Sequence, residues 1–549
     1  MILSSLLILA SLAAVHGQLL FPANQVPFAA PFGATGVPGG AGALWEAGGR
    51  VPRVAIIGGG AGGSSAAYFL SHFSKLKDLG LKTDVTVYES SEYIGGRSTV
   101  LWPWNDNPLE DPRKLGEPDD LHEEPVEAGA SIFVSANLNL QKAWRVFNLS
   151  YEPYGGEPGH TAIWDGEHWV YEDGGKLGGG WLEKIRLLWR YGRSPFTVRG
   201  LVKTTVNSFL NLYSPSFVSQ GAFPSLHNFS AATGLQEASA QYADKYFKER
   251  SVSPLFTNEL VSAATQVNYC NPVSRIHGVG ALVSLAATGA VSIKGGNRRI
   301  FEEFVGRSGA RLRLGKDARV ETLLKLDGGK GKRAQWVVKT ASGVGGGVYD
   351  IVILAAPYWQ TGIHMVNSVA PSLIPHQLYK QLFVTFVITN ATTPQPSYFG
   401  FPESTKMPNE IFGTFSTSST SKPTFNSLNY LKPLPPSIGS KFGAGTFHVV
   451  KMFSDRSLEP ELLDALYGRG NVAKTVEKIW LAYPKLQPVT SEHDFAPVRP
   501  DEGFYYVNGF ERLISTMETE TVSSFNVVSL LLKDLFDYTP PTSWAEWEE

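Results

Sequence analysis

The pattern of apolar and polar positions first becomes regular near residue 51. Residues 54–57 are continuously apolar, which is typical of a strand buried on both faces of a parallel sheet. A run of small and apolar residues, 64–70, follows within a few positions and predicts a helix. A second apolar strand at 85–88 completes a strand–helix–strand unit. The pattern therefore predicts an α/β fold from this point onward.

Later segments continue this alternation. Residues 350–357 form an apolar strand that ends in small residues and proline, as a central parallel strand does where it abuts a ligand. The apolar run 382–388 fits the inner face of a second sheet, with the lining of a tunnel as the alternative. Ser515 or Thr516 can cap a helix that continues to residue 536. The other expected elements are a helix at 298–305, strands at 310–314, 318–324 and 334–340, and a short strand with a turn at 503–511.

The glycines between the first strand and the first helix form the pattern G-x-G-x-x-G. Gly58 permits a tight turn, Gly60 lets the backbone approach a pyrophosphate, and Gly63 lets helix and strand pack closely. The helix N-terminus offers free N–H groups and partial positive charge to the phosphates. The second strand ends at Glu89, whose carboxylate can accept hydrogen bonds from a ribose. This context predicts a dinucleotide site rather than a chance cluster of glycines.

A second glycine motif favours FAD over a nicotinamide cofactor. Gly95, Gly96 and Arg97 follow shortly after Glu89. A glycine pair lets the backbone fold under a diphosphate, and an arginine can bind a phosphate oxygen with its planar fork. For this segment alone, a glycine turn with a solvated arginine is the alternative. Because the segment follows the first motif, we expect FAD, with the small residues of 126–134 leaving room for it.

We therefore predict an α/β protein with a Rossmann-like FAD-binding domain and a mixed α+β substrate domain. The parallel sheet of the first domain is expected to be discontinuous in sequence. A chain of 549 residues is long enough for two or more domains. The expected divisions are a signal peptide at 1–17, a Pro/Gly-rich linker at 18–50, FAD-binding segments at 51–150, 291–360 and 498–549, and substrate-domain segments at 151–290 and 361–497.

The composition of the chain argues against several classes of function and site. The formal net charge of −2 argues against general nucleic-acid binding. Cys270 is the only cysteine, so an intrachain disulfide or a CxxC site is excluded, and we expect a buried small hydrophobe. The acidic segment 101–125 lacks a fixed ligand spacing, so we interpret it as a solvated insertion and predict no metal site. No convincing Ser-His-Asp or paired-carboxylate array stands out, so the catalytic residues stay unassigned.

The first 17 residues resemble a signal peptide, with an apolar run too short to span a bilayer comfortably. Three Asn-x-Ser/Thr sequons, at Asn148, Asn228 and Asn390, support delivery to the secretory pathway. We expect a soluble protein in the lumen of a vacuole or lysosome, or a secreted one. Basic and aromatic residues dominate 176–203, which we interpret as a helix pair with a solvated basic face. Peripheral membrane contact is the alternative for that segment.

Together these motifs resemble the prenylcysteine oxidase (prenylcysteine lyase) family, a branch of the FAD enzymes related to flavin amine oxidases. The resemblance runs from about Val51 to Phe536. The glycine motifs, Glu89, Arg97 and residues 127–130 are shared with many FAD oxidases. The more specific segments are 266–269, 290–297, 449–454, 480–484 and 504–511.

The resemblance implies that the motif residues bind FAD, with Ala130 in the same series, Val320 near the adenine and Glu518 near the isoalloxazine end. It also implies oxidation of S-farnesyl- or S-geranylgeranyl-cysteine by molecular oxygen in the catabolism of prenylated proteins. The products would be cysteine, an isoprenoid aldehyde and hydrogen peroxide. Such a substrate predicts an apolar tunnel with polar groups at one end. We infer no obligate protein partner. A flavin amine oxidase acting on another substrate, and a secreted carrier that has lost turnover, are the alternatives.

Overall fold

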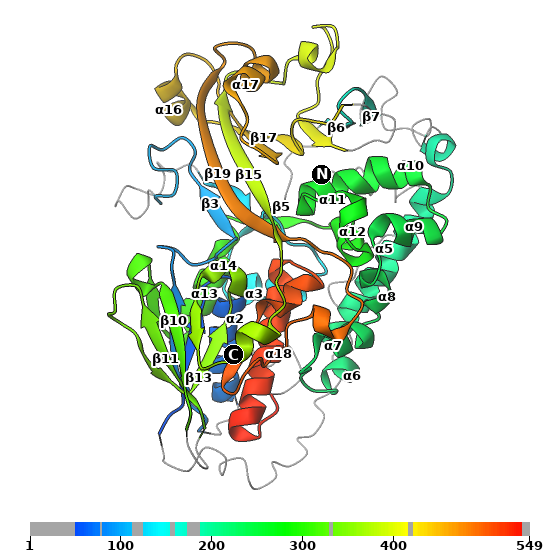
Figure 1. Ribbon diagram of the computed structural model, residues 1–549. Helices are drawn as coiled ribbons and strands as arrows, with labels where there is room; N and C mark the ends of the chain where they lie inside the picture. The colour runs from blue at the N-terminus through cyan, green and yellow to red at the C-terminus, as the bar shows by residue number, and fades with distance from the viewer. Residues whose placement is uncertain are drawn as a thin grey trace.

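A five-stranded parallel sheet, in the order β20-β13-β1-β2-β9, organises one side of the molecule (Figure 1). The computed structural model describes residues 50–76, 80–111, 124–153, 160–172, 187–328, 333–414 and 421–540. The strands come from distant parts of the chain, so this sheet is discontinuous in sequence as predicted. They are β1 (Arg53–Ile57), β2 (Asp84–Glu89), β9 (Arg311–Leu314), β13 (Ile351–Leu354) and β20 (Phe504–Tyr506).

From Val54 to Ile57 strand β1 is apolar, and both of its faces are buried there. Val54 and Ile56 belong to the core formed with the helices, whereas Ala55 and Ile57 pack into a second core beneath a small sheet. That sheet has the order β12-β11-β10-β14 and covers the second face. Its strands are β10 (Val320–Leu326), β11 (Gln335–Thr340), β12 (Gly347–Tyr349) and β14 (His364–Val366).

Three helices cover the first face: α2 (Ala61–Leu76), α13 (Arg298–Ser308) and α18 (Met517–Phe536). Thr516 caps the N-terminus of helix α18, because its hydroxyl accepts a hydrogen bond from the N–H of Thr519 at 3.1 Å. Its fully buried Val527 and Leu531 pack in the same core as Ile56. Full burial of one such side chain contributes roughly 1.5–3 kcal/mol, so this late helix is a large part of what holds the first domain together.

A seven-stranded sheet, in the order β19-β15-β18-β17-β16-β6-β7, forms the second part of the molecule. Its two longest strands, β15 and β19, run side by side along the upper part of Figure 1. Side chains alternate across β15, so Leu382, Val384, Phe386 and Ile388 share one core while Val387 lies in another. The strands are β6 (Thr161–Trp164), β7 (Trp169–Glu172), β15 (Tyr379–Thr389), β16 (Glu410–Gly413), β17 (Ser427–Pro433), β18 (His448–Ser454) and β19 (Val472–Pro484).

A group of helices lies beside this sheet, on the right in Figure 1. Helix α12 contacts both α5 and α11, so these three form one continuous layer. The helices are α5 (Ser194–Leu210), α6 (Pro215–Val218), α7 (Leu226–Ala232), α8 (Gln236–Ser239), α9 (Ala243–Glu249), α10 (Pro254–Phe256), α11 (Ser262–Tyr269) and α12 (Gly278–Ser284).

Short elements connect these layers. The strands β3 and β4 pair with each other, and β5 pairs with β8. Their bounds, with those of the remaining helices, are β3 (Thr99–Leu101), β4 (Val126–Gly129), β5 (Tyr151–Pro153), β8 (Val291–Ile293), α3 (Leu138–Val146), α14 (Tyr358–Thr361), α15 (Ala370–Leu373), α16 (Pro436–Gly439) and α17 (Pro460–Tyr467).

The predicted fold class is confirmed: a Rossmann-like parallel sheet is combined with a mixed α/β second part. The apolar run 382–388 lies in strand β15, as the sheet interpretation predicts, and none of its residues lines the cavity described below. Cys270 is buried in an apolar cluster, as expected. The domain boundaries stay predictions.

Several predictions fall outside the described residues. They concern the signal peptide, the linker up to residue 49, residues 112–123 of the acidic segment, and residues 176–186 of the basic and aromatic segment. Within the part that the structure describes, no helix is both long enough and apolar enough to cross a membrane.

Candidate functional site

A cavity of about 590 Å³ lies where the parallel sheet, the seven-stranded sheet and the helical layer meet. This size is typical of small-molecule sites. Its lining has three parts that differ in chemistry: a glycine cradle, a sheet wall and a helical wall. The glycine cradle consists of Gly58, Gly60, Gly95 and Gly96; the sheet wall of Glu410, Phe412, Ser427, Asn429, Lys451 and Phe453; and the helical wall of Val206, Phe209, Leu235, Val267 and Val283.

The glycine cradle brings two loops together at the end of β1. Gly58 has a φ of 109°, and a Cβ on Gly63 would lie 1.8 Å from the carbonyl oxygen of Gly58. Glycine is therefore required at both positions for the turn and the helix packing. Gly60 forms an isolated bridge with Gly95, and a Cβ on it would meet only Gly95 and Gly96, at 3.8–3.9 Å. A side chain at Gly60 would thus fill the space of the cradle itself.

Glu89 lies at the carboxyl end of β2 and lines the same cavity. Its carboxylate accepts hydrogen bonds from the N–H of Gly59 at 2.8 Å and from the N–H of Ser91 at 2.7 Å. Both bonds hold the carboxylate against the glycine loop. The N–H groups of the first turn of α2 have no partner within their helix and face the same end of the cavity. The protein groups predicted to bind the ribose and the pyrophosphate therefore lie side by side.

Arg97 lines the cavity, but its guanidinium is engaged by protein groups. Both terminal nitrogens donate to the buried carboxylate of Glu511, one of them at 2.9 Å, and one also donates to the carbonyl of Ala482 at 3.2 Å. Tyr379 and Ser515 donate to the same carboxylate. The phosphate contact predicted for Arg97 stays a prediction, because in this structure the fork of the guanidinium faces Glu511.

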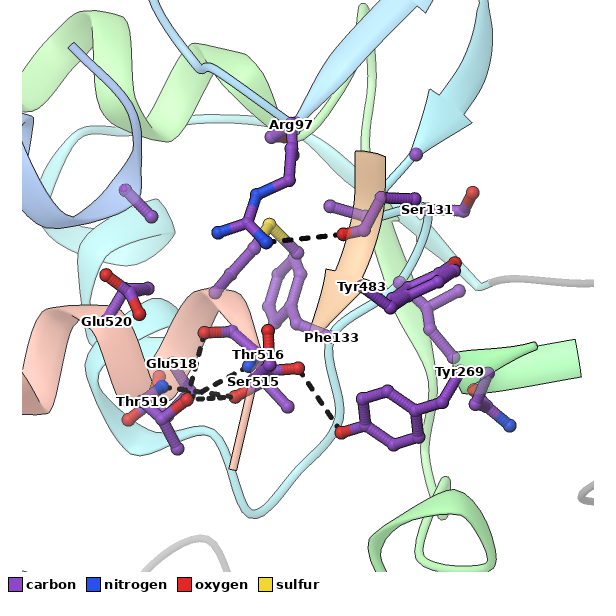
Figure 2. A pocket seen from close by; sticks show the side chains of 18 of the residues that line it. Arg97, Ser131, Phe133, Tyr269, Tyr483, Ser515, Thr516, Glu518, Thr519 and Glu520 are labelled. Carbon is purple, nitrogen blue, oxygen red and sulfur yellow. Dashed lines mark hydrogen bonds between the residues drawn. The ribbon is translucent and has the colours of Figure 1, made fainter. Parts of the chain in front are cut away.

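Two carboxyl groups in the first turn of α18 line the cavity (Figure 2). Glu518 is fully buried and accepts hydrogen bonds from the N–H groups of Asn139 (2.8 Å) and Leu140 (3.0 Å), at the start of α3. Burial raises the pKa of Glu518 to about 7. Burial and repulsion from Glu511 raise the pKa of Glu520 well above its ordinary value. Both shifts favour the protonated carboxyl over the charged one.

The cavity lining carries buried polar atoms that lack a hydrogen-bond partner among the described residues. Natural proteins rarely leave such groups unsatisfied, so they indicate a ligand that supplies the partners. Together with the glycine cradle, they fit a bound dinucleotide. The atoms are Ser98 Oγ, Trp480 Nε1, Asn508 Oδ1 and Glu520 Oε1.

An aromatic pair lies on the other side of the cavity from α18 in Figure 2. The rings of Tyr269 and Tyr483 are 5.8 Å apart at their centroids and steeply inclined, at 74°. The hydroxyl of Tyr269 donates to the carbonyl of Ser515 at 3.2 Å, which ties the helical layer to the start of α18. Burial raises the pKa of both phenols, so both stay neutral.

Lys451 brings a positive charge into this mostly apolar space. It lies on β18, its side chain is buried, and its ammonium donates to Ser131 Oγ at 3.0 Å. Burial lowers the pKa of Lys451, and the nearby carboxyl of Glu127 opposes this effect. Burial raises the pKa of Glu127 in turn. A charged group kept in a desolvated cavity is a strong candidate for ligand binding.

The predicted site residues are largely brought together. The four cradle glycines, Glu89, Arg97, Ala130 and Glu518 all line the cavity, and Gly63 lies directly behind it. Val320 does not line it: its side chain is buried in the core under the small sheet. The three sequon asparagines, Asn148, Asn228 and Asn390, are all exposed.

Several residues in the lining or directly behind it had no predicted role. Lys451 stands in the otherwise apolar segment 449–453, and that charge was a usable signal. Glu511 and Glu520 carried no such signal, since their importance depends on burial beside Arg97. In the basic and aromatic segment, Arg190 pairs with Glu259 while Trp189 is 88% exposed. Membrane contact there stays a prediction.

Comparisons with known proteins agree with this arrangement. Residues 178–540 match the family described as prenylcysteine lyase, and residues 56–148 match the NAD(P)-binding Rossmann-like domain. Farnesylcysteine lyase of Arabidopsis thaliana is 28% identical over 87% of this chain and 88% of its own length. Prenylcysteine oxidase 1 of Bos taurus is 26% identical over 88% and 90%.

Among solved structures, cyclohexylamine oxidase from Brevibacterium oxydans IH-35A has a TM-score of 0.53 at 11% identity. The match covers 88% of this chain and 100% of the other. Because the identity is so low, the likeness concerns the fold alone. The family match spans well over half of the chain, including the helical layer, the sheet wall and α18. This chain therefore belongs to the prenylcysteine lyase family.

Proposed function

We propose that this protein is an FAD-dependent thioether oxidase that cleaves S-prenyl-L-cysteine. The observation that carries the proposal is the union of a glycine cradle and an apolar helical wall in one cavity of about 590 Å³. A cradle of bare backbone suits a diphosphate, and a wall of Val, Leu and Phe side chains suits a long isoprenoid. The relatives named farnesylcysteine lyase and prenylcysteine oxidase 1 support the same assignment.

The reaction consumes one molecule each of thioether, water and dioxygen, and yields cysteine, an isoprenoid aldehyde and hydrogen peroxide. The carbon bonded to sulfur is also allylic, so positive charge that develops there on loss of hydride is stabilised by both neighbours. When bound, FAD would supply the hydride acceptor and the two-electron chemistry with dioxygen.

The residues of the chain have positioning roles. The glycine cradle, the first turn of α2 and Glu89 would hold the dinucleotide, and the carboxyl of Glu520 lines the same cavity. The helical wall excludes water from the isoprenoid. The buried ring of Tyr269 and the partly buried ring of Tyr483 line the same cavity, where they can pack against the substrate. Such a reaction depends on orientation and dryness more than on a strong base.

One experiment tests the proposal. Purified protein should be yellow, with absorbance near about 450 nm, as expected for an oxidised flavin. With S-farnesyl-L-cysteine it should release thiol and hydrogen peroxide in equal amounts. Colourless protein that binds farnesylcysteine without turnover would instead indicate a carrier. Peroxide formed from a polyamine but not from farnesylcysteine would indicate an amine oxidase.

We also propose that the protein enters the secretory pathway and carries N-linked glycans. The signal-like residues 1–17 and the exposed side chains of Asn148, Asn228 and Asn390 support this. The three sequons are not equivalent, because the hydroxyl of Ser230 is buried and donates to the carbonyl of His227 inside α7. Expression in a eukaryotic host should give a glycosidase-sensitive mass shift that Asn148→Gln and Asn390→Gln reduce. A mass equal to that of the bare full chain would refute the proposal.

A further inference from the structure

The sheet wall carries a row of polar side chains on adjacent strands. Glu410 on β16 is the Cα partner of Asn429 on β17, and Asn429 is the partner of Lys451 on β18. Directly paired residues point to the same face of a sheet, with Cβ atoms roughly 5 Å apart. All three line the cavity, as do Phe412, Ser427 and Phe453 two residues away. The row thus presents an acid, an amide and a base to one cavity.

The neighbours of this row are mostly apolar. Across β15, Phe386 is the partner of Lys451, and it is fully buried. Phe412 and Phe453 lie beside the row on the same face. The titratable and polar groups that approach Lys451 from the facing strand and loop are Glu127 and Ser131. Polar groups in such surroundings need hydrogen-bond partners, and a ligand in the cavity can supply some of them.

The charges of the row match an α-amino acid. An ammonium has three donors, and Lys451 donates one of them to Ser131. At the opposite end, the carboxylate of Glu410 accepts a hydrogen bond from Thr161 at 2.9 Å, and a carboxylate can accept several. The helical wall offers no comparable charges. An amphipathic ligand would therefore place its zwitterionic end on the sheet wall and its apolar end on the helical wall.

We propose that Lys451 binds the α-carboxylate of the substrate, while Glu410 and Asn429 receive its α-ammonium. The inference rests on the proposed function and names the residues that select the amino-acid end. These residues orient the substrate between the two walls, so that the carbon beside the sulfur is presented in one position. They select for a free cysteine head and against blocked ones.

The test compares S-farnesyl-L-cysteine with its methyl ester, which lacks the carboxylate, and with its N-acetyl derivative, which lacks the ammonium. Lys451→Met should raise KM for the free acid about ten- to a hundredfold, as expected for a lost charge-assisted hydrogen bond, and change KM for the ester little. Glu410→Gln should reduce the preference for the free amine over the N-acetyl form. Lys451→Arg should retain the preference for the acid.

A second readout does not depend on turnover. Calorimetric titration with S-dodecyl-L-cysteine, which has no allylic carbon, should show weaker binding by Lys451→Met and unchanged binding by Lys474→Met. Lys474 serves as the matched control because it lies on the same sheet but outside the cavity, bonded to the carbonyl of Asn105. Flavin content and melting temperature should be equal in the proteins that are compared.

The outcomes separate the two proposals. If the wild type neither binds nor oxidises farnesylcysteine, the proposed function fails. If it oxidises farnesylcysteine but Lys451→Met lowers kcat equally for acid and ester, with KM unchanged, the head-group inference is wrong and Lys451 acts on the chemical step. If Lys451→Met does not fold, a Lys451→Arg protein that has lost the preference for the acid would contradict the inference.

Discussion

The glycine cradle and the sheet wall line the same cavity but recognise a ligand in different ways. The cradle uses bare backbone, and a Cβ on Gly58 or Gly63 would lie 2.4 Å or less from a carbonyl oxygen. The sheet wall uses side chains on three strands, Glu410, Asn429 and Lys451, that are paired in space but distant in sequence. Backbone recognition leaves a fixed local motif, whereas side-chain recognition can use any residue that the register brings into place. The comparison predicts which substitutions each region tolerates.

The largest effect is expected in the cradle. Gly60→Val should abolish flavin retention, because the new side chain occupies the space where the diphosphate approaches the backbone. The measurement is the ratio of flavin to protein absorbance after purification. Gly306→Val, at a helical site with open space around it, is the control and should remain yellow. A fully flavinated Gly60→Val protein would show that the cofactor lies elsewhere.

The second prediction concerns the guanidinium of Arg97, which can either stabilise the fold through Glu511 or bind the cofactor. Glu511→Gln removes the buried partner of Arg97 and should lower the free energy of unfolding of the flavin-free protein by about 3 kcal/mol. Denaturant titration gives this value. Glu303→Gln breaks an exposed pair with Arg307 and should cost about 0.5 kcal/mol or less. If Glu511→Gln leaves stability unchanged but weakens flavin binding, the guanidinium serves the cofactor instead.

A third prediction concerns the pH dependence of stability at the start of α18. The pKa of Glu518 is about 7 in the folded protein and about 4.5 when unfolded, so the folded state holds its proton more tightly. The contribution of this group to the free energy of unfolding is fully present below pH 4.5. As the pH rises to about 7, that contribution falls by up to about 3 kcal/mol. The difference in unfolding free energy between wild type and Glu518→Gln should fall over that range. A flat difference would mean that Glu518 is ionised throughout.

The smallest effect is expected in the helical wall. Val283→Trp fills part of the space for the isoprenoid, so it should raise KM for the geranylgeranyl substrate about tenfold more than for the farnesyl substrate. Steady-state kinetics with both substrates measures this. Val344→Trp, at a position that is 77% exposed, should alter neither KM. Equal changes for both substrates would place the tail elsewhere in the cavity.

The sequence by itself determined the dinucleotide end of the site. Residues 54–63 and Glu89 lie within one local unit, so their arrangement follows from the geometry of a single strand–turn–helix–strand motif. Buried strands such as 351–354 could be read for the same reason, since continuous apolarity reports burial on both faces. The cap of α18 at Thr516 was equally local.

Only the tertiary structure decided the rest. Arg97 meets Glu511 across 414 positions, and Glu127 meets Lys451 through two different sheets. The row on the sheet wall depends on the register of three strands, and a shift of one residue would turn all three side chains to the opposite face. Charge, burial and register combine only in the folded chain, because each depends on neighbours that the local sequence does not contain.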